Sequence, residues 1–365
     1  MIFCAACDPG GSRAMLPVIM ELERRKASYR VLAHGFLGDE LPPALRHVLC
    51  SRGESLHLVG QSSIFFFSSS VSDTLPLALA RKARDAGIPI VHLLDNWSAY
   101  ASRLATDGLP PLVPDVYAVM DEAAREGAAA EGLPPETLVI VGHPGLGEIV
   151  TPLRPRDIDR RNSAELLGLP TDKLLLAFLD EAFAEALGRD EHLPGHPGFT
   201  EDTILPAFAS ALAPFADQVY VVLLPHPRGN PANLAALWKK SRQGLAGEIL
   251  TLTQGRHILP AINGIAGMAS ILLYEAWLTG LPVLSMQPGC RWDSLRRFAF
   301  LDGIAYADTW QHIPATVTAW MALCGKQSLP HPRPELALHA AASKHMADIL
   351  TQFPRRPTAH THVRR

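Results

Sequence analysis

Short apolar runs that alternate with longer amphipathic stretches limit most strongly how this chain can fold. In the first half, strands are predicted at 1–7, 29–35, 55–59, 64–68, 89–94, 116–119 and 137–141, and helices at 12–26, 74–86 and 122–131. The second half repeats the pattern, with strands at 174–179, 219–224, 248–252 and 282–286, helices at 203–215 and 232–240, and a loop and helix over 267–278. Buried strands separated by helices are typical of parallel sheets covered by helices.

The length of 365 residues suggests two domains, at about 150 residues per domain. We predict an α/β protein with a Rossmann-like domain over 1–150, a Pro- and Arg-rich linker over 151–170, and a nucleotide-binding Rossmann-like domain over 171–330. A helix is predicted over 331–353, and one alternative is that it crosses back to pack on the first domain. Residues 354–365 are predicted to be a frayed tail. Ligands bind beyond the carboxyl ends of parallel strands, so we expect a ligand cleft between two such domains.

The composition argues against several classes of protein. Hydrophobic residues make up 48% of the chain and charged residues 19%, with a net charge of -3, which is ordinary for a globular protein. Because there is no basic excess, we expect no nucleic-acid partner. No apolar run is long enough for a transmembrane segment, and the apolar start is too short for a secretory signal. Five scattered cysteines fit a reducing compartment, so we expect a cytoplasmic protein.

Cys4 and Cys7 have the spacing of a CxxC motif. We place both in the first predicted strand, where residues an odd number apart point to opposite faces. We therefore predict neither a redox site nor a metal site at these cysteines.

A glycine-rich segment, Asp8-Pro9-Gly10-Gly11-Ser12-Arg13, directly follows the first predicted strand. Two glycines let the backbone approach a ligand closely, and the following helix offers free N–H groups to a phosphate or sugar oxygen. We take Gly10, Gly11, Ser12 and Arg13 as candidate binding residues. The alternative is a tight strand-to-helix turn in which Ser12 is the N-cap.

A second segment, Leu224-Pro225-His226-Pro227-Arg228, lies at the carboxyl end of the strand predicted at 219–224. The two prolines stiffen the backbone around His226, whose imidazole can hydrogen-bond a diphosphate or act as a general acid or base. Arg228 can pair with a phosphate. The alternative is a surface loop with a solvated histidine and arginine.

A third segment begins with small residues, Gly264 to Ser270, and continues into an apolar helix. Gly267 and Ser270 would meet a phosphate, or Ser270 would only cap the helix. Glu275 is the only charged residue of this helix, and a buried carboxylate needs a hydroxyl or basic partner. A ribose diol would satisfy it, and so would a salt bridge to a neighbouring arginine.

Three further candidates lie in the first half. Asp95 follows the strand at 89–94 and can act as a base or orient a ligand. Asp73 lies in a Ser-rich loop, where it can contact the ligand or cap the next helix. His143, near the end of the first domain, can contact the ligand or pack at a hinge.

The order of these segments resembles that of the GT-B-fold nucleotide-sugar enzymes, in particular the UDP-N-acetylglucosamine 2-epimerases and the glycosyltransferases built on two Rossmann-like domains. The resemblance spans most of residues 1–330. It is clearest at Ser72-Asp73-Thr74 with His92 to Asn96, at Glu131-Gly132-Leu133 with Val141-Gly142-His143, at Pro225-His226-Pro227, and at Met268 to Leu284. In the last passage Glu275-Ala276 and Gly280-Leu281-Pro282-Val283 are in register with the family, and the resemblance implies that Glu275 binds the nucleotide ribose.

The sequence departs from the family at several catalytic positions. Met268-Ala269-Ser270-Ile271 replaces the family's D-S-G-G, and no residue matches its further catalytic glutamate. We therefore predict an enzyme that transfers a glycosyl group from a nucleotide-diphosphate sugar to an unidentified acceptor, with Asp95, His226 and Asp73 as catalytic candidates. The alternatives are a 2-epimerase, a nucleotide-sugar hydrolase, or a non-catalytic nucleotide-sugar-binding protein. The scheme uses no metal and no cofactor. The oligomeric state stays open, with a homodimer among the alternatives.

Overall fold

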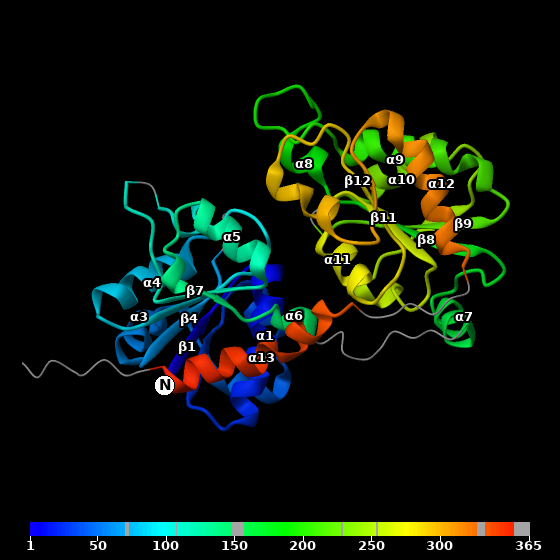
Figure 1. Ribbon diagram of the computed structural model, residues 1–365. Coiled ribbons are helices and arrows are strands. Elements are labelled where there is room, and N and C mark those ends of the chain that lie inside the picture. Colours follow the sequence, from blue (N-terminus) through cyan, green and yellow to red (C-terminus); the bar gives the residue numbers. More distant parts are fainter. Residues whose placement is uncertain are drawn as a thin grey trace, which may run out of the picture. The chain divides into compact units, whose positions relative to one another are not determined.

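The computed structural model describes residues 1–69, 73–106, 108–147, 157–227, 229–252, 255–326 and 333–353 of the chain. The chain divides into two compact units, one formed by Met1–Val150 with Glu335–Arg365 and the other by Thr151–Pro334. Each unit contains a parallel sheet accompanied by helices (Figure 1). The predicted α/β class with two Rossmann-like domains is therefore confirmed. Among the described helices, none is both long and apolar enough to cross a lipid bilayer.

The sheet of the first unit has seven strands in the order β3-β2-β1-β4-β5-β6-β7. Its strands are β1 Ile2–Ala5, β2 Tyr29–Leu32, β3 Leu49–Cys50, β4 Ile64–Phe67, β5 Ile90–Leu93, β6 Val116–Val119 and β7 Leu138–Ile140. All their pairings are parallel, with Ile2 opposite Ile64 at the centre of the sheet. The central strands β1, β4 and β5 are buried along their whole length, which explains the uninterrupted apolar sequence of β1 and β4; in β5 only His92 is polar.

The helices of the first unit are α1 Pro9–Arg24, α2 Gly35–Glu40, α3 Arg52–Gln61, α4 Leu75–Asp85, α5 Glu122–Ala130, α6 Pro144–Gly147 and α13 Glu335–Gln352. The predicted strand at 55–59 is wrong, because these residues belong to α3. Ser51 and Glu54 form a capping box at the start of that helix, and this local signal outweighs the short apolar pattern.

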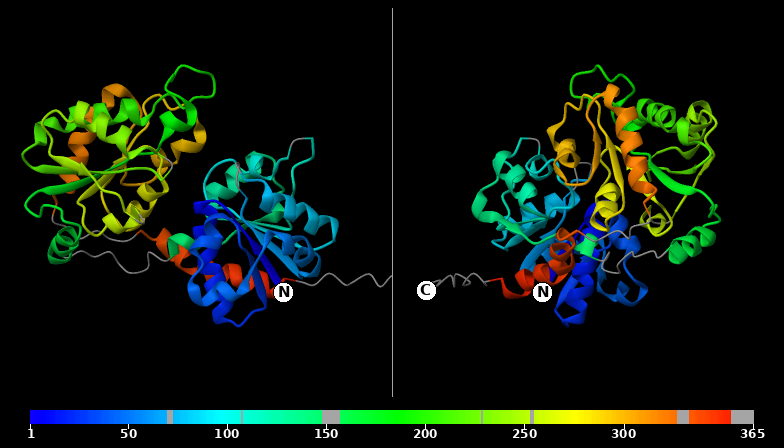
Figure 2. Two further views of the ribbon diagram at one scale, coloured as in Figure 1. Left: turned by 180° about the vertical axis from the view of Figure 1, so that it is seen from behind. Right: turned by 45° about the vertical axis from the view of Figure 1, so that its right-hand side comes forward.

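The last helix, α13, belongs to the first unit although it follows the second in the sequence. It packs against α1 and α6, and both views in Figure 2 show it, in red, against the blue part of the chain. Met346, Ala347 and Leu350 are buried in the core of this unit, and Arg25, which directly follows α1, forms an ion pair with Asp348 at 2.5 Å. The predicted return of the C-terminal helix is confirmed.

The sheet of the second unit has six parallel strands in the order β10-β9-β8-β11-β12-β13. They are β8 Leu174–Leu179, β9 Val219–Leu224, β10 Gly247–Ile249, β11 Gly264–Gly267, β12 Val283–Met286 and β13 Ala305–Ala307. Its α-helices are α7 Asp157–Leu166, α8 Phe183–Leu187, α9 Glu201–Leu212, α10 Pro231–Ser241, α11 Ile271–Leu278 and α12 Ile313–Cys324. Its core joins the sheet to α9 and α12 through Phe178, Phe208 and Trp320, whose rings are adjacent.

Several elements of this unit differ from the predictions. Residues 264–267 form β11, which was not predicted as a strand; small residues fit there because Trp320 and Cys324 lie against Gly264. Residues 157–166, taken as linker, form α7, and α12 was not predicted.

Replacement of Met346 by alanine tests the docking of α13. Removal of a fully buried methionine is expected to lower the free energy of unfolding by about 2–5 kcal/mol. Met20→Ala is the matched control, because Met20 lies in α1 and is 47% exposed. Denaturant unfolding measures both variants, and equal stabilities would contradict the described packing of α13.

Candidate functional site

In the second unit, β8 and β11 are neighbours, and the chain leaves them toward opposite edges of the sheet. Open α/β sheets bind ligands at such a point, just beyond the carboxyl ends of the strands. Asp180 and Glu181 follow β8, and residues 268–270 join β11 to α11. The carboxyl ends of β8 and β11, called here the carboxyl edge of the sheet, are therefore the candidate site of the second unit.

The side chain of Glu181 joins these two strand ends. Its Oε1 accepts a hydrogen bond from the backbone N–H of Met268 at 2.6 Å, and both its oxygens accept from the N–H of Ala269 at 2.8 Å. The N–H of Ser270 donates to the same carboxylate, and Gly267 lies beside it. Successive N–H groups before a helix form an anion-binding site. A carboxylate of the chain itself thus occupies the position predicted for a phosphate.

Burial changes the ionisation of Glu181, whose side chain is 8% exposed. Burial raises the pKa of Glu181 from its ordinary value of 4.5 to about 7. The backbone N–H groups lower this pKa only in part, and the charge of Asp180 raises it further. A carboxyl group with a pKa near neutrality is suited to general acid or base catalysis.

Glu275 lies in α11 and is 5% exposed. Its Oε1 is 3.4 Å from Nη2 of Arg256, which belongs to the short helix η6, Gly255–Ile258. The structure therefore contains the salt bridge considered as one alternative, and ribose binding stays a prediction. Ser270 Oγ accepts a hydrogen bond from the N–H of Leu272 at 3.2 Å and caps α11.

His226 follows β9 at the same sheet edge. Its backbone N–H donates to Oδ2 of Asp180 at 3.1 Å, so Asp180 ties the loop after β9 to the end of β8. Arg228 lies outside the described residues. The sheet edge of the second unit thus carries His226, Gly267, Ser270 and Glu275 among the predicted site residues.

In the first unit, α1 begins earlier than predicted. Gly10, Gly11 and Ser12 form its first turn, and the N-cap residue is Asp8 rather than Ser12. Ser12 is buried and its hydroxyl donates to the carbonyl oxygen of Cys7 at 3.4 Å, whereas Arg13 is exposed.

Asp95 follows β5 and lies against this first turn. A Cβ atom on Gly10 would collide with the Asp95 carboxylate, so the glycine is needed for the close approach. Asp95 Oδ1 accepts a hydrogen bond from Nη1 of Arg103 at 2.6 Å, and Arg103 is 6% exposed. The structure thus brings Gly10 and Asp95 together and adds a buried arginine.

Asp73 and His143 lie in other surroundings. Asp73 Oδ2 is 2.7 Å from Nε2 of His34, and its Oδ1 accepts from the N–H of Leu75 at the start of α4. His143 is buried, its backbone N–H donates to Nδ1 of His339 in α13 at 3.0 Å, and its own Nδ1 accepts from Leu146. This agrees with the packing alternative for His143.

Sequence reasoning missed several polar residues at the sheet edges. Asp180 and Glu181 form an acidic pair directly after a strongly apolar strand, and this position could have marked them as site candidates. His34 follows β2 in the same way. Arg103 carried no such signal, because only folding brings it to Asp95.

No family model matches the sequence, and no curated protein matches it. Solved structures match its fold. The UDP-GlcNAc 2-epimerase of Methanocaldococcus jannaschii superposes with a TM-score of 0.64 and 12% identity, covering 96% of this chain and 98% of that one. The Neisseria meningitidis UDP-GlcNAc 2-epimerase bound to UDP-GlcNAc has a TM-score of 0.61 and 11% identity, covering 96% and 99%. Anabaena HepE in complex with UDP-glucose has a TM-score of 0.58 and 13% identity, covering 96% and 94%. The chain therefore has the two-domain fold of these proteins.

The raised pKa of Glu181 predicts a pH-dependent stability. Between pH 4.5 and about 7 the unfolded chain loses this proton while the folded chain retains it, so the free energy of unfolding falls as the pH rises. Glu181→Gln removes this pH dependence. The free energy of unfolding of the variant, relative to that of the wild type, is expected to rise by about 3 kcal/mol between pH 4 and pH 8.

Denaturant unfolding of both proteins at the two pH values measures the difference. Glu185→Gln, at an exposed glutamate of α8, serves as the control. A Glu181→Gln difference that does not change with pH would rule out the raised pKa.

Proposed function

We propose that this chain is an enzyme that acts on a UDP-sugar. The observation that carries the proposal is the fold, which spans 96% of the chain and is shared with proteins solved with UDP-glucose and with UDP-GlcNAc. The sheet edge of the second unit supports it, because a run of backbone N–H groups there lies next to a helix with a buried carboxylate. Proteins use such arrangements to bind phosphates.

We assign the nucleotide to this edge. Glu275 has only acceptor atoms when ionised, which suits the two hydroxyl groups of a ribose. Arg256 orients that carboxylate through the 3.4 Å contact. His226 and Arg228 are proposed to contact the diphosphate.

The diphosphate and Glu181 compete for the same N–H groups in this proposal. An ionised Glu181 would both fill the site and repel the phosphates, whereas a protonated Glu181 carries no charge and hydrogen-bonds the N–H groups more weakly. Since its pKa is about 7, the neutral form is well populated near neutral pH. Glu181 is therefore proposed to yield the site to the diphosphate in its neutral form.

A neutral Glu181 beside the diphosphate also holds a proton for the departing UDP. Epimerisation at C2 by elimination breaks the bond between C1 and the phosphate oxygen, and it needs a base for the C2 proton and stabilisation of the leaving group. Asp95 of the first unit is the proposed base, with Asp73 as the alternative. This reaction is favoured because the matching folds include 2-epimerases.

Glycosyl transfer is the second candidate. The observation in its favour is that Met268-Ala269-Ser270-Ile271 replaces the pattern expected of 2-epimerases. Asp95 would then deprotonate an acceptor hydroxyl, and the leaving UDP would be stabilised in the same way.

Incubation with UDP-GlcNAc in deuterated water tests these assignments. Epimerisation is expected to place deuterium at C2 of the substrate and its epimer, as measured by NMR and mass spectrometry. Free sugar would indicate hydrolysis instead, and no product without an acceptor would favour transfer. Thermal stabilisation by UDP-sugars with no turnover across a panel of donors and acceptors would support a binding protein, and neither binding nor turnover would refute the proposal.

Glu275→Ala is expected to weaken UDP-GlcNAc binding by about a hundredfold or more, because two hydrogen bonds to a charged carboxylate are lost, each contributing about 1.5 kcal/mol or more. Glu165→Ala, at an exposed position of α7, is the matched control. Calorimetric titration measures the affinity of both variants. Unchanged affinity in Glu275→Ala would remove this residue from the nucleotide site.

A further inference from the structure

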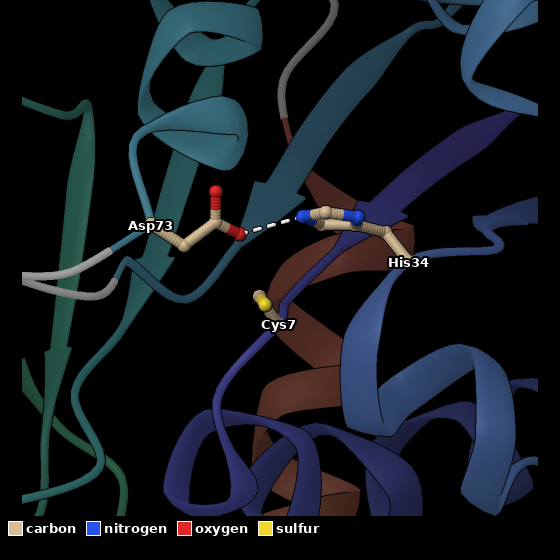
Figure 3. Close-up of side chains that lie close together, drawn as sticks. All are labelled: Cys7, His34 and Asp73. Carbon is tan, nitrogen blue, oxygen red and sulfur yellow. Dashed lines mark hydrogen bonds and ion pairs between the residues drawn. The ribbon is translucent and has the colours of Figure 1, made fainter.

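Cys7, His34 and Asp73 converge at the carboxyl edge of the sheet in the first unit. Cys7 lies just beyond β1, His34 lies between β2 and α2, and Asp73 precedes α4. Figure 3 shows the three side chains pointing toward one another from these separate segments. One ligand atom from each, a sulfur, an imidazole nitrogen and a carboxylate oxygen, lies within 4.8 Å of the other two.

Backbone contacts hold these residues in place. The N–H of Phe36 donates to the carbonyl oxygen of Cys7 at 3.0 Å, which fixes the start of α2 against the end of β1. Gly35 has a φ of +51°, and a Cβ atom there would lie 2.6 Å from Cys7 Sγ, so only glycine permits this approach. Asp73 is fixed by its bond from the N–H of Leu75 at 3.0 Å.

The arrangement does not suit a cysteine nucleophile. Such a cysteine needs an imidazole as its base, whereas here the imidazole of His34 is hydrogen-bonded to Asp73 rather than to Cys7 (Figure 3). Burial, together with Asp73, raises the pKa of the Cys7 thiol to about 12. The thiol therefore stays protonated in the metal-free protein.

The set of ligand types is that of a transition metal. Thiolate, imidazole and carboxylate are the three side-chain ligands of protein-bound Zn²⁺, whereas Mg²⁺ and Ca²⁺ take oxygen ligands. The side chains of His34 and Asp73 are 27% and 22% exposed, and Cys7 is half-buried, so an ion can reach them from solvent.

We propose that Cys7, His34 and Asp73 form a zinc site at the end of β1. The ion replaces the hydrogen bond between Asp73 and His34, and the thiol proton is released to solvent as Cys7 binds as thiolate. Three protein ligands leave a fourth position for water or a ligand oxygen, which is the ligand count of catalytic zinc sites. The site belongs to one unit alone and does not depend on the proposed UDP-sugar activity.

This proposal revises the expectation of no metal at the CxxC spacing. The alternation argument assumed that Cys7 lies in the first strand, but β1 ends at Ala5 and Cys7 lies in the following loop. Cys4 is buried within the strand and takes no part.

Titration of the reduced, chelator-treated protein with Co²⁺ tests the site. Co²⁺ substitutes for Zn²⁺ and reports a thiolate ligand through a sulfur-to-cobalt charge-transfer band. We expect this band to saturate at one ion per chain and to disappear when Zn²⁺ is added. The band is expected to be lost in Cys7→Ser. The affinity for Co²⁺ is expected to fall at least tenfold in His34→Ala and in Asp73→Ala. Cys290→Ser, at another half-buried cysteine, is the control and is expected to keep both the band and the affinity.

Protection of Cys7 from alkylation by added Zn²⁺, measured by mass spectrometry on the wild-type protein, gives a second readout that needs no variant. Absence of both the charge-transfer band and the protection would overturn the proposal and leave a metal-free hydrogen-bonded cluster. Retention of the band in a folded Cys7→Ser protein would also overturn it. No nucleotide is present in either measurement, so failure here leaves the UDP-sugar proposal untouched.

Discussion

The hydrogen bonds between Glu181 and the backbone before α11 determine most of what the second unit can do. They join the end of β8 to the end of β11, at the point where the strand order of the sheet reverses. A sheet edge of this kind presents N–H groups that need an acceptor, and in this chain a buried carboxylate supplies it. The same contact that completes the fold therefore occupies the position where an anionic ligand would bind.

This contact has a further consequence, because the group that fills the site titrates near neutrality. Desolvation of Glu181 opposes its charge, and the N–H groups offset that effect only in part. A change of one proton can thus alter both the stability of the unit and the availability of the proposed anion site. The first unit differs, because Asp95 at its sheet edge is paired with the buried guanidinium of Arg103.

Much of the fold was predictable because buried parallel strands leave a strong apolar signal. The strands β6, β8 and β9 coincide with their predicted bounds, since each is a short, mostly apolar run that directly follows a polar residue. The apolar pattern failed to predict elements whose structure is set by small residues or by helix caps. The strand β11 consists of glycine, isoleucine and alanine, and α3 is fixed by the capping box at Ser51 rather than by its weak apolar pattern.

The candidate site was predictable only in part. Glu275 stood out as a lone charge in an apolar helix, whereas only folding brings its partner Arg256 within 3.4 Å of it. Glu181 was missed because its hydrogen-bond donors, the N–H groups after β11, are distant in the sequence and come to it only in the fold. The cluster at Cys7 was missed because the predicted first strand ended two residues too late. Cys7 was therefore given the alternating side-chain direction of a strand, although it lies in the following loop.

The central claim is that the N–H groups before α11 bind a diphosphate once Glu181 is neutral. Calorimetric titration with UDP-GlcNAc at pH 6 and pH 8 tests it directly, because the diphosphate diester keeps its charge over this range. With a pKa of about 7, the neutral fraction of Glu181 falls about tenfold, so the wild-type affinity is expected to fall about tenfold from pH 6 to pH 8. Glu181→Gln is expected to bind with the higher affinity at both values. Equal wild-type affinities at the two pH values, or no binding at either, would contradict the account.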